Sequence, residues 1–187
     1  MGDAATVRPT IESNRLILRP FMMSDAKAVQ TLAGHPLIFA TTASIPHPYL
    51  DGMAEAWIGT HEGIYLKGQA VQFAVVLKDS GELIGNVSLF DISREHSRAE
   101  VGYWIAVDKW GNGFGTEVAR ASMKYGFETL KLNKITARYV STNEASGKIM
   151  ERLGMKREGY FRQHARKNGA LVDVVHYGLL ASESTLT

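Results

Sequence analysis

Apolar and polar residues alternate with a period of two in several stretches of the chain, which is the pattern of half-buried strands. Residues 15–21 (RLILRPF) and 98–107 (RAEVGYWIAV) show it most clearly. Further short stretches, rich in β-branched residues, predict strands over 70–78, 83–92, 134–140 and 170–180. In the 98–107 strand, alternation puts two sets of side chains on opposite faces. They are Val101, Tyr103, Ile105 and Val107 on one face, and Glu100, Gly102, Trp104 and Ala106 on the other.

Other stretches have the helical period and recognisable ends. They predict helices over 24–33 with Ser24 as N-cap, 52–67, 114–129, and 144–153 with Asn143 as N-cap. The expected buried stripes are Phe114, Val118, Ala121 and Tyr125 in the third helix, and Ala145, Ile149 and Leu153 in the fourth. Residues 35–51 contain three prolines and predict a loop. The segment before 170–180 predicts a closing hairpin that turns at Asn168-Gly169.

The order of these elements is one strand, two helices, three strands, a helix, a strand, a helix and a hairpin. This order predicts an α/β (mixed α+β) domain in which helices flank a mixed sheet. The 187 residues are expected to form a single domain, 1–187. Its core spans about 15–180, and residues 1–10 and 182–187 are expected to be flexible.

Composition narrows the functional classes. Lys and Arg number 21 against 19 Asp and Glu, so the formal net charge is +2, and neither direct nucleic-acid binding nor membrane binding is expected. The chain has no cysteine, which excludes disulfides and thiolate chemistry and fits a cytoplasmic location. The six histidines lack metal-ligand spacing, so no metal site is expected.

A glycine-rich segment, WGNGFGTEVA (110–119), stands between the 98–107 strand and the following helix. It lacks the Lys of a Walker loop and the last glycine of a dinucleotide fingerprint. A bare backbone before a helix start nevertheless suits an anion such as phosphate, because free amides and the helix dipole converge there. A tight turn that merely redirects the chain is the other interpretation that this segment allows.

A resemblance favours the anion site. The stretch VGYWIAVDKWGNGFGTEVARASMKYGFE, followed by NEASGKIMERLGMKREG, resembles the acetyl-CoA-binding core of the GNAT acetyltransferase superfamily, and RLILRPF resembles the first strand of its RimJ/RimL branch. The similarity covers about residues 15–180. It implies a splayed, mostly antiparallel mixed sheet flanked by about four helices.

The resemblance implies roles for individual residues. Backbone amides of the glycine segment are expected to hold the coenzyme A pyrophosphate, over Trp110, Gly111, Asn112, Gly113, Phe114, Gly115 and Thr116. Trp110 replaces the Gln or Arg that is usual in the superfamily, as in the RimJ/RimL branch. The pantetheine arm is expected near Ile105, Val107 and Asn143. Lys148 and Arg152 are candidates to reach the 3′-phosphate.

The reaction needs a neutral amine and a proton for the leaving thiolate. Glu100, in the stretch that resembles the branch's E-x-G-Y motif, is the candidate base, and Asp91 is a weaker alternative. Glu100 also fits a solvated carboxylate or a partner for Arg98. Ser146 is the candidate acid, because Met150 stands where many GNAT proteins carry a tyrosine. A water molecule could deliver the proton equally well.

The expected function is acetyl-CoA-dependent N-acetylation of a primary amine, foremost a protein N-terminal α-amino group such as that of a ribosomal protein. A small amine is an alternative acceptor. Two alternatives belong to other functional classes. They are a coenzyme A-binding regulatory module without catalysis and a nucleotide-binding protein. A homodimer is the default expectation for the assembly.

Overall fold

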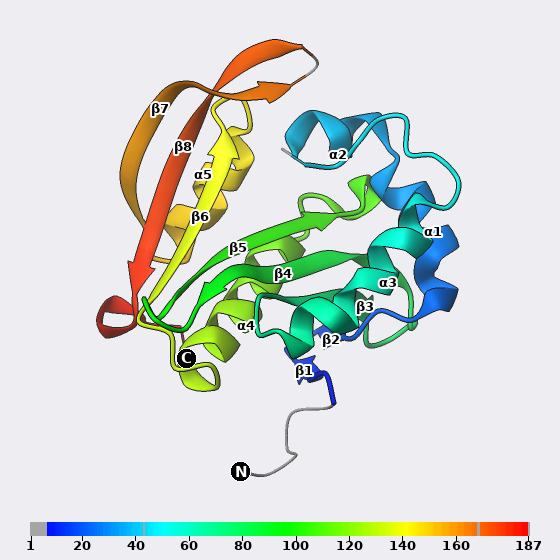
Figure 1. Cartoon of the computed structure of the whole chain (residues 1–187), viewed down its shortest axis with the longest axis horizontal. Helices are drawn as coiled ribbons and strands as arrows, with labels where there is room; N and C mark the ends of the chain where they lie inside the picture. The colour runs from blue at the N-terminus through cyan, green and yellow to red at the C-terminus, as the bar shows by residue number, and fades with distance from the viewer. Residues whose placement is uncertain (1–6, 43, 168, 187) are drawn as a thin grey trace.

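The computed structural model describes residues 7–42, 44–167 and 169–186, and the strands in these ranges form one eight-stranded sheet (Figure 1). The strand order is β1-β2-β3-β4-β5-β6-β8-β7. Every neighbouring pair is antiparallel except β5 and β6, which are parallel. The mixed, mostly antiparallel sheet that the sequence predicts is therefore confirmed.

The strands agree with the alternating stretches, and the short β1 is an addition. Their bounds are β1 Ile11–Glu12, β2 Leu16–Arg19, β3 Val71–Leu77, β4 Leu83–Ser93, β5 Arg98–Ile105, β6 Lys134–Val140, β7 Lys156–Lys167 and β8 Ala170–Leu180. The helices are α1 Ala26–Ala33, α2 Pro36–Thr41, α3 Met53–Leu66, α4 Phe114–Glu128 and α5 Glu144–Arg152. The described residues thus hold five α-helices where the sequence led us to expect about four.

The additional helix is α2, in the segment that its prolines marked as a loop. Pro36 occupies the first turn of α2, where its missing N–H is no loss. The His35 ring accepts a hydrogen bond from the Leu37 amide at 3.1 Å and caps the helix. The expectation of a loop over 35–51 was wrong here because proline starts a helix as readily as it ends one.

The start of α1 also differs from the prediction. Ser24 lies inside a short 3₁₀ turn, and Asp25, not Ser24, is the N-cap residue of α1. The Asp25 carboxylate pairs with Arg19 at 2.7 Å and accepts a hydrogen bond from the Met22 amide. Asp25 makes no side-chain cap hydrogen bond to α1, because its carboxylate is engaged by Arg19 and by the Met22 amide.

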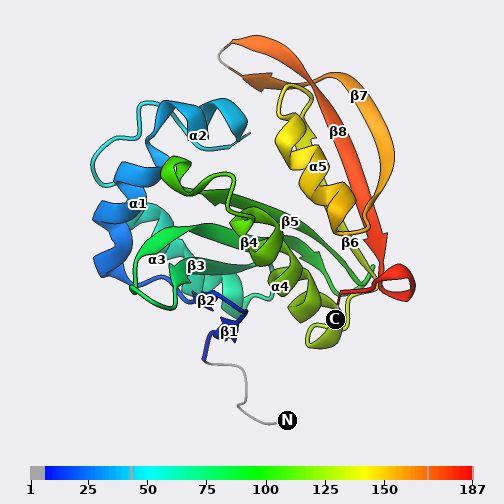
Figure 2. The ribbon, with the colours of Figure 1, turned by 180° about the vertical axis from the view of Figure 1, so that it is seen from behind.

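Helices cover both faces of the sheet. Helices α1 and α3 pack on one face of β3–β5, and α4 and α5 pack on the other, as the two opposite views show (Figures 1 and 2). Neighbouring residues of β5 enter the two different cores: Ile105 packs with α4 and α5, and Trp104 packs with Phe21 and Ile58. Val107 follows the end of β5 and packs beside Trp104, so its predicted place on the face of Ile105 was wrong.

The buried faces of α4 and α5 are rotated from the predicted stripes. In α4 the fully buried residues are Val118, Ala119, Ser122, Met123 and Gly126, while Phe114, Ala121 and Tyr125 are only partly buried. In α5 Ala145 is exposed, and Gly147 and Met150 are buried. A Cβ atom on Gly147 would lie 2.7 Å from the Tyr139 hydroxyl, so α5 approaches β6 through a glycine.

The parallel strands β5 and β6 separate soon after they meet. Their register pairs only Arg98–Glu100 with Lys134–Thr136, and the rest of β5 has no partner in β6. Beyond Glu100 the two strands diverge, so the sheet divides into two arms (Figure 1). This splay opens a gap in the middle of the sheet.

The predicted closing hairpin is formed by β7 and β8, although Asn168 of its turn lies outside the described residues. The hairpin reaches α2, where the Lys167 ammonium donates to the carbonyls of Ala40 and Thr42, to the latter at 2.8 Å. At the C-terminal end Leu186 is buried in the core. At the other end, 1–6 lie outside the described residues.

Helix α3 carries a histidine inside an aromatic cluster. His61 is fully buried, and the rings of Phe21 and Trp57 lie 5.4 and 4.4 Å from it. Neither ring nitrogen has a hydrogen-bond partner among the described residues. Burial, assisted by the charge of Arg8, lowers the pKa of His61 to about 4.

We predict that His61 makes the protein less stable as the pH falls from about 6.5 to about 4. In this window the unfolded chain protonates the imidazole and the folded chain does not, so the stabilisation present above pH 6.5 is lost, by about 3 kcal/mol in total. His61→Leu should remove this part of the pH dependence when urea unfolding is measured at pH 7 and pH 4. The exposed His96→Leu is the matched control. Equal pH dependence in all three proteins would contradict the prediction.

Candidate functional site

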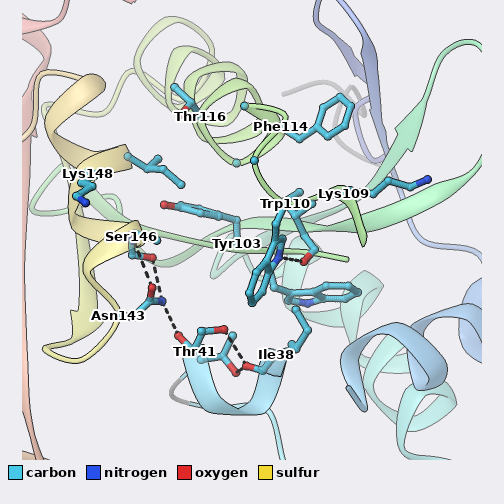
Figure 3. Close-up of a pocket in the computed structure, with 18 of the residues that line it drawn as sticks. Ile38, Thr41, Tyr103, Lys109, Trp110, Phe114, Thr116, Asn143, Ser146 and Lys148 are labelled. Carbon is cyan, nitrogen blue, oxygen red and sulfur yellow. Dashed lines mark hydrogen bonds between the residues drawn. The ribbon is translucent and has the colours of Figure 1, made fainter. Parts of the chain in front are cut away.

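A cavity of about 330 Å³ opens at the splay between β5 and α5 (Figure 3). Segments far apart in the sequence contribute to it: α2, the end of β5, the glycine segment with the first turn of α4, and α5. The sequence-predicted residues that line it are Ile105, Trp110, Gly111, Gly113, Phe114, Gly115, Thr116, Asn143, Ser146, Lys148 and Arg152. Val107, Asn112 and Glu100 are not among its lining residues.

The three glycines of the segment serve two physical purposes. Gly111 and Gly113 have φ angles of 79° and 80°, in the left-handed region that other residues rarely adopt. Gly115 has ordinary helical geometry, but a Cβ atom there would lie 3.0 Å from Ile149 Cδ1. Two glycines therefore permit the turn, and the third keeps a side chain out of the contact between α4 and α5.

The first turn of α4 faces the cavity with free backbone donors. The first hydrogen bond of the helix runs from the Glu117 amide to the Gly113 carbonyl at 3.1 Å, so the amides before it have no intrahelical acceptor. Glu117 itself pairs with Arg15 at 2.7 Å, which neutralises its charge near this end of the helix. The amides and the dipole of α4 can thus hold an anion.

Side chains hold the glycine segment in place. The Trp110 indole N–H donates to the Ile105 carbonyl at 2.7 Å, which ties the segment to the end of β5 (Figure 3). The Asn112 amide group donates to the carbonyls of Lys109 and Trp110, so this side chain folds onto the segment. The Asn112 carbonyl in turn accepts from Arg15 at 3.0 Å. Asn112 therefore stabilises the turn from outside the cavity.

Asn143 caps α5 as predicted and also has a second partner. Its side-chain oxygen accepts from the Ser146 amide at 3.4 Å, and its side-chain nitrogen donates to the Thr41 carbonyl at 2.9 Å (Figure 3). Together with Lys167, Asn143 binds the carbonyls at the end of α2. Helix α2 therefore connects the two arms of the sheet at the outer end of the splay.

Tyr103 is a candidate that the sequence analysis missed. Its ring extends from β5 toward α5, and its hydroxyl is buried without a hydrogen-bond partner in the described part of the chain (Figure 3). Burial raises the pKa of this phenol to about 12, although the nearby Ser146 hydroxyl lowers it slightly. Alternation placed Tyr103 on one face with Val101 and Ile105, and only its place in the GYW stretch beside Glu100 could have drawn attention to it.

Glu100 lies on the opposite face of the sheet from Tyr103. Its side chain is only 14% exposed, and Oε1 is 2.9 Å from Nε of Arg138 on β6, so its partner is Arg138 and not Arg98. Burial raises the pKa of Glu100; Arg138 acts against the rise, and Asp91 adds to it. Asp91 lines a separate hollow between α3, β3 and β4.

The groups that line the cavity and the Glu100 carboxylate lie on opposite sides of the sheet at the splay. Amides, Tyr103 and Ser146 face the cavity on the side of α4 and α5, and a carboxylate with a raised pKa faces the other side. A substrate bound in the cavity could pass its reactive end through the gap toward Glu100. In the described part of the chain, no cluster of three His, Asp or Glu side chains is placed to hold a metal ion, and no helix has the length and apolar character to cross a membrane.

Comparisons with known proteins agree with this geometry. Residues 15–156 match the family model of the acetyltransferase (GNAT) domain. The Bacillus subtilis protein YoaA, named an uncharacterized N-acetyltransferase, is 31% identical over 92% of this chain and 97% of its own. The Escherichia coli [ribosomal protein uS5]-alanine N-acetyltransferase is 30% identical over 74% and 72%. The solved structure of Mycobacterium smegmatis RimJ with CoA-disulfide shares the fold, with a TM-score of 0.85, 21% identity and coverage of 94% and 88%.

We predict that Gly113→Ala lowers the free energy of unfolding by about 1 kcal/mol, because alanine is strained at a positive φ. The matched control is Gly63→Ala, inside α3, where a Cβ atom meets nothing within 4 Å. This substitution should raise the free energy of unfolding by about 1 kcal/mol, because alanine favours the helix. Urea unfolding measures both changes. Stabilisation by both substitutions would show that Gly113 does not need its left-handed conformation.

Proposed function

The chain belongs to the GNAT acetyltransferase family, and from this premise we propose that it transfers the acetyl group of acetyl-CoA to a protein N-terminal α-amino group. The observation that carries the proposal is the arrangement at the splay of β5 and β6. An amide-lined anion site and a buried carboxylate face this gap from opposite sides of the sheet. Such a gap lets a donor and an acceptor approach each other from opposite faces.

The cavity has groups that suit coenzyme A, the substrate that this family uses. We assign the pyrophosphate to the amides of α4 and the glycine segment, and the 3′-phosphate to Lys148 and Arg152, which also line the cavity. Because backbone amides make the main contacts, Trp110 does not interfere with this assignment. Acetyl-CoA, when bound, supplies an activated acetyl group and a thiolate leaving group.

Glu100 is proposed to accept the proton of the attacking amine, directly or through water. An α-amino group has a pKa near ~8, so part of it is already neutral at physiological pH, whereas a lysine side chain has a pKa near ~10.4. Burial raises the pKa of Glu100, which makes the carboxylate a better base. A single carboxylate of this kind suits an N-terminal amine better than a lysine.

Proton delivery to the leaving sulfur is assigned to Ser146, with Tyr103 as a second candidate. Met150 is 2% exposed and packs in the core, so it has no part in the cavity. The Tyr103 phenol keeps its proton at neutral pH, and its hydroxyl lies near Ser146. A thiol has a pKa of about 8.5, so even a weak donor is sufficient. A polar pair, Ser146 and Tyr103, thus replaces the tyrosine that is absent from position 150.

The contact between the β7–β8 hairpin and α2 favours a thin, flexible substrate. Lys167 connects the tip of the β7–β8 hairpin to α2, so the hairpin and α2 are joined beside the splay (Figure 1). A chain end fits beneath such a bridge more easily than a side chain on a folded surface. One relative is named for the acetylation of a ribosomal-protein alanine, which supports a protein N-terminus as the acceptor here.

Turnover of acetyl-CoA, followed by the release of free thiol, tests the proposal. The acceptors are peptides with free N-termini, the same peptides with blocked N-termini and a lysine, and a small polyamine. We expect release with the free N-termini and acetylation at the α-amino group by mass spectrometry. Turnover with the polyamine alone would assign a small-amine enzyme. Tight coenzyme binding without turnover on any acceptor would identify a binding module.

We predict that Glu100→Gln loses the acidic part of the pH profile. In the wild-type protein, kcat/KM should fall as the pH decreases through the raised pKa of Glu100, because the protonated carboxyl cannot accept the amine proton. The variant should be slower and lack this fall. Asp91→Asn, which removes the weaker candidate base, should keep the wild-type profile. An unchanged profile in Glu100→Gln would remove Glu100 as the base.

A further inference from the structure

The acceptor side of the splay carries an arginine with unused hydrogen-bond donors. Arg138 lies on β6 two residues beyond Thr136, the last residue that pairs with β5, and therefore at the inner end of the gap. Its Nε atom bonds Glu100, and its side chain is 43% exposed. Within the described residues, the contact given for this guanidinium is the ion pair at Nε, and its two terminal nitrogens donate no hydrogen bond. A guanidinium presents five donors in a planar fork, so most of this fork is available to a ligand.

His176 on β8 is the register neighbour of Arg138 and faces the same side. Its Nε2 atom is buried and has no hydrogen-bond partner among the described residues. The rings of Phe161 and His164 lie 4.6 and 5.9 Å away from the imidazole. Burial, Arg138 and His164 lower the pKa of His176, so the ring is neutral at pH 7 and one nitrogen carries a proton.

A buried polar atom without a hydrogen-bond partner destabilises a protein. Here that atom is Nε2 of His176, and the residue beside it is Arg138, whose terminal nitrogens are also without a partner among the described residues. Arg138 can donate to an acceptor directly, and His176 can donate to the same acceptor once its ring turns the Nε2 atom, which is closed to solvent here, toward the ligand. A carboxylate matches the planar fork of arginine with two oxygens. The other charged groups nearby leave this preference intact. Glu158, which is near His176, is paired with Lys134 at 2.8 Å, and Glu100 already shares its charge with Arg138 through Nε.

The spacing fits one acceptor molecule with two charged groups. Arg138 contacts Glu100 at 2.9 Å, and His176 stands one strand beyond Arg138, because it is the register neighbour of Arg138 on β8 and adjacent strands lie about 4.8 Å apart. An extended peptide advances about 3.3 Å per residue. When the α-amino group of the acceptor lies at Glu100, the side chain of the second residue reaches Arg138 and His176.

We propose that Arg138 and His176 form a carboxylate-binding subsite, so the preferred acceptor is an N-terminus with an acidic second residue. This inference rests on the proposed N-terminal acetyltransferase function and names its substrate class. Arg138 and His176 are specificity residues in this assignment. The amine end of the acceptor is directed to Glu100, and its acidic side chain is directed to Arg138 and His176.

The test compares kcat/KM for peptides that begin with alanine and differ only in the second residue, which is Glu, Gln or Lys. The wild-type protein should prefer Glu over Gln by about tenfold, the effect of one charge-assisted contact, and Lys should be the poorest. Arg138→Gln should bring the Glu/Gln ratio close to one. Arg138→Lys should restore part of it. The ratio is the measurement, because Arg138→Gln also alters Glu100 and changes the rate for every peptide.

The matched control is Arg157→Gln. Arg157 lies on β7 in the hairpin that also carries His176, and its guanidinium packs over the Tyr160 ring. This variant should keep the wild-type ratio. Equal rates for the three peptides, or a preference for Lys, overturn the carboxylate subsite and leave the proposed function standing. A lack of turnover on every peptide overturns both. Free alanine is also compared with alanine amide and with the peptides. If free alanine is turned over best, the subsite binds the α-carboxylate of an amino acid, and the second-residue assignment is overturned.

Discussion

The separation of β5 from β6 is the constraint on which the rest of the site depends. The two strands share only three register positions, and the sheet then divides into two arms. Sheet backbone that diverges in this way loses its ladder partners, so other contacts must hold the arms at their distance. Asn143 and Lys167, which both reach from the C-terminal arm, provide them by donating to the three carbonyls at the end of α2. Helix α2 thus keeps the gap open at a defined width.

The donor side of the gap is made mainly of backbone. Gly111 and Gly113 supply the left-handed turn, and Gly115 lets α4 approach Ile149. Trp110 fixes this segment to β5 through a backbone carbonyl. In the proposed anion site the donors are amides and not side chains, so Trp110 in place of Gln or Arg alters the support of the segment without removing those donors. Under the proposed function, binding of the coenzyme pyrophosphate therefore depends little on which side chains this segment carries.

The sequence predicts the elements well because strand alternation and helix periodicity are local properties. It also predicts the Asn143 cap, whose partner is three residues away. Helix α2 was missed because Pro36 has opposite meanings at the start and in the interior of a helix. The pairing of Glu100 with Arg138 could not be predicted, since it depends on the register of β5 and β6 and the two residues are 38 positions apart in the chain. Tyr103 was not singled out, because a period of two gives the face on which a residue lies and not the cavity that opens over that face.

The proposed acceptor side of the sheet is formed by side chains, whereas the proposed donor side is formed mainly by backbone amides. Here charged and aromatic side chains from three strands meet: Glu100 on β5, Arg138 on β6, and His176 on β8. Each can be replaced without disturbing the strand ladder, because ladder bonds belong to the backbone. A sheet that binds its donor through amides and its acceptor through side chains can keep one reaction and change its substrate by a few substitutions. Under the proposed function, the carboxylate beside the gap must stay for proton transfer, whereas the cation two residues beyond the last strand pair is the proposed determinant of which N-terminus is accepted.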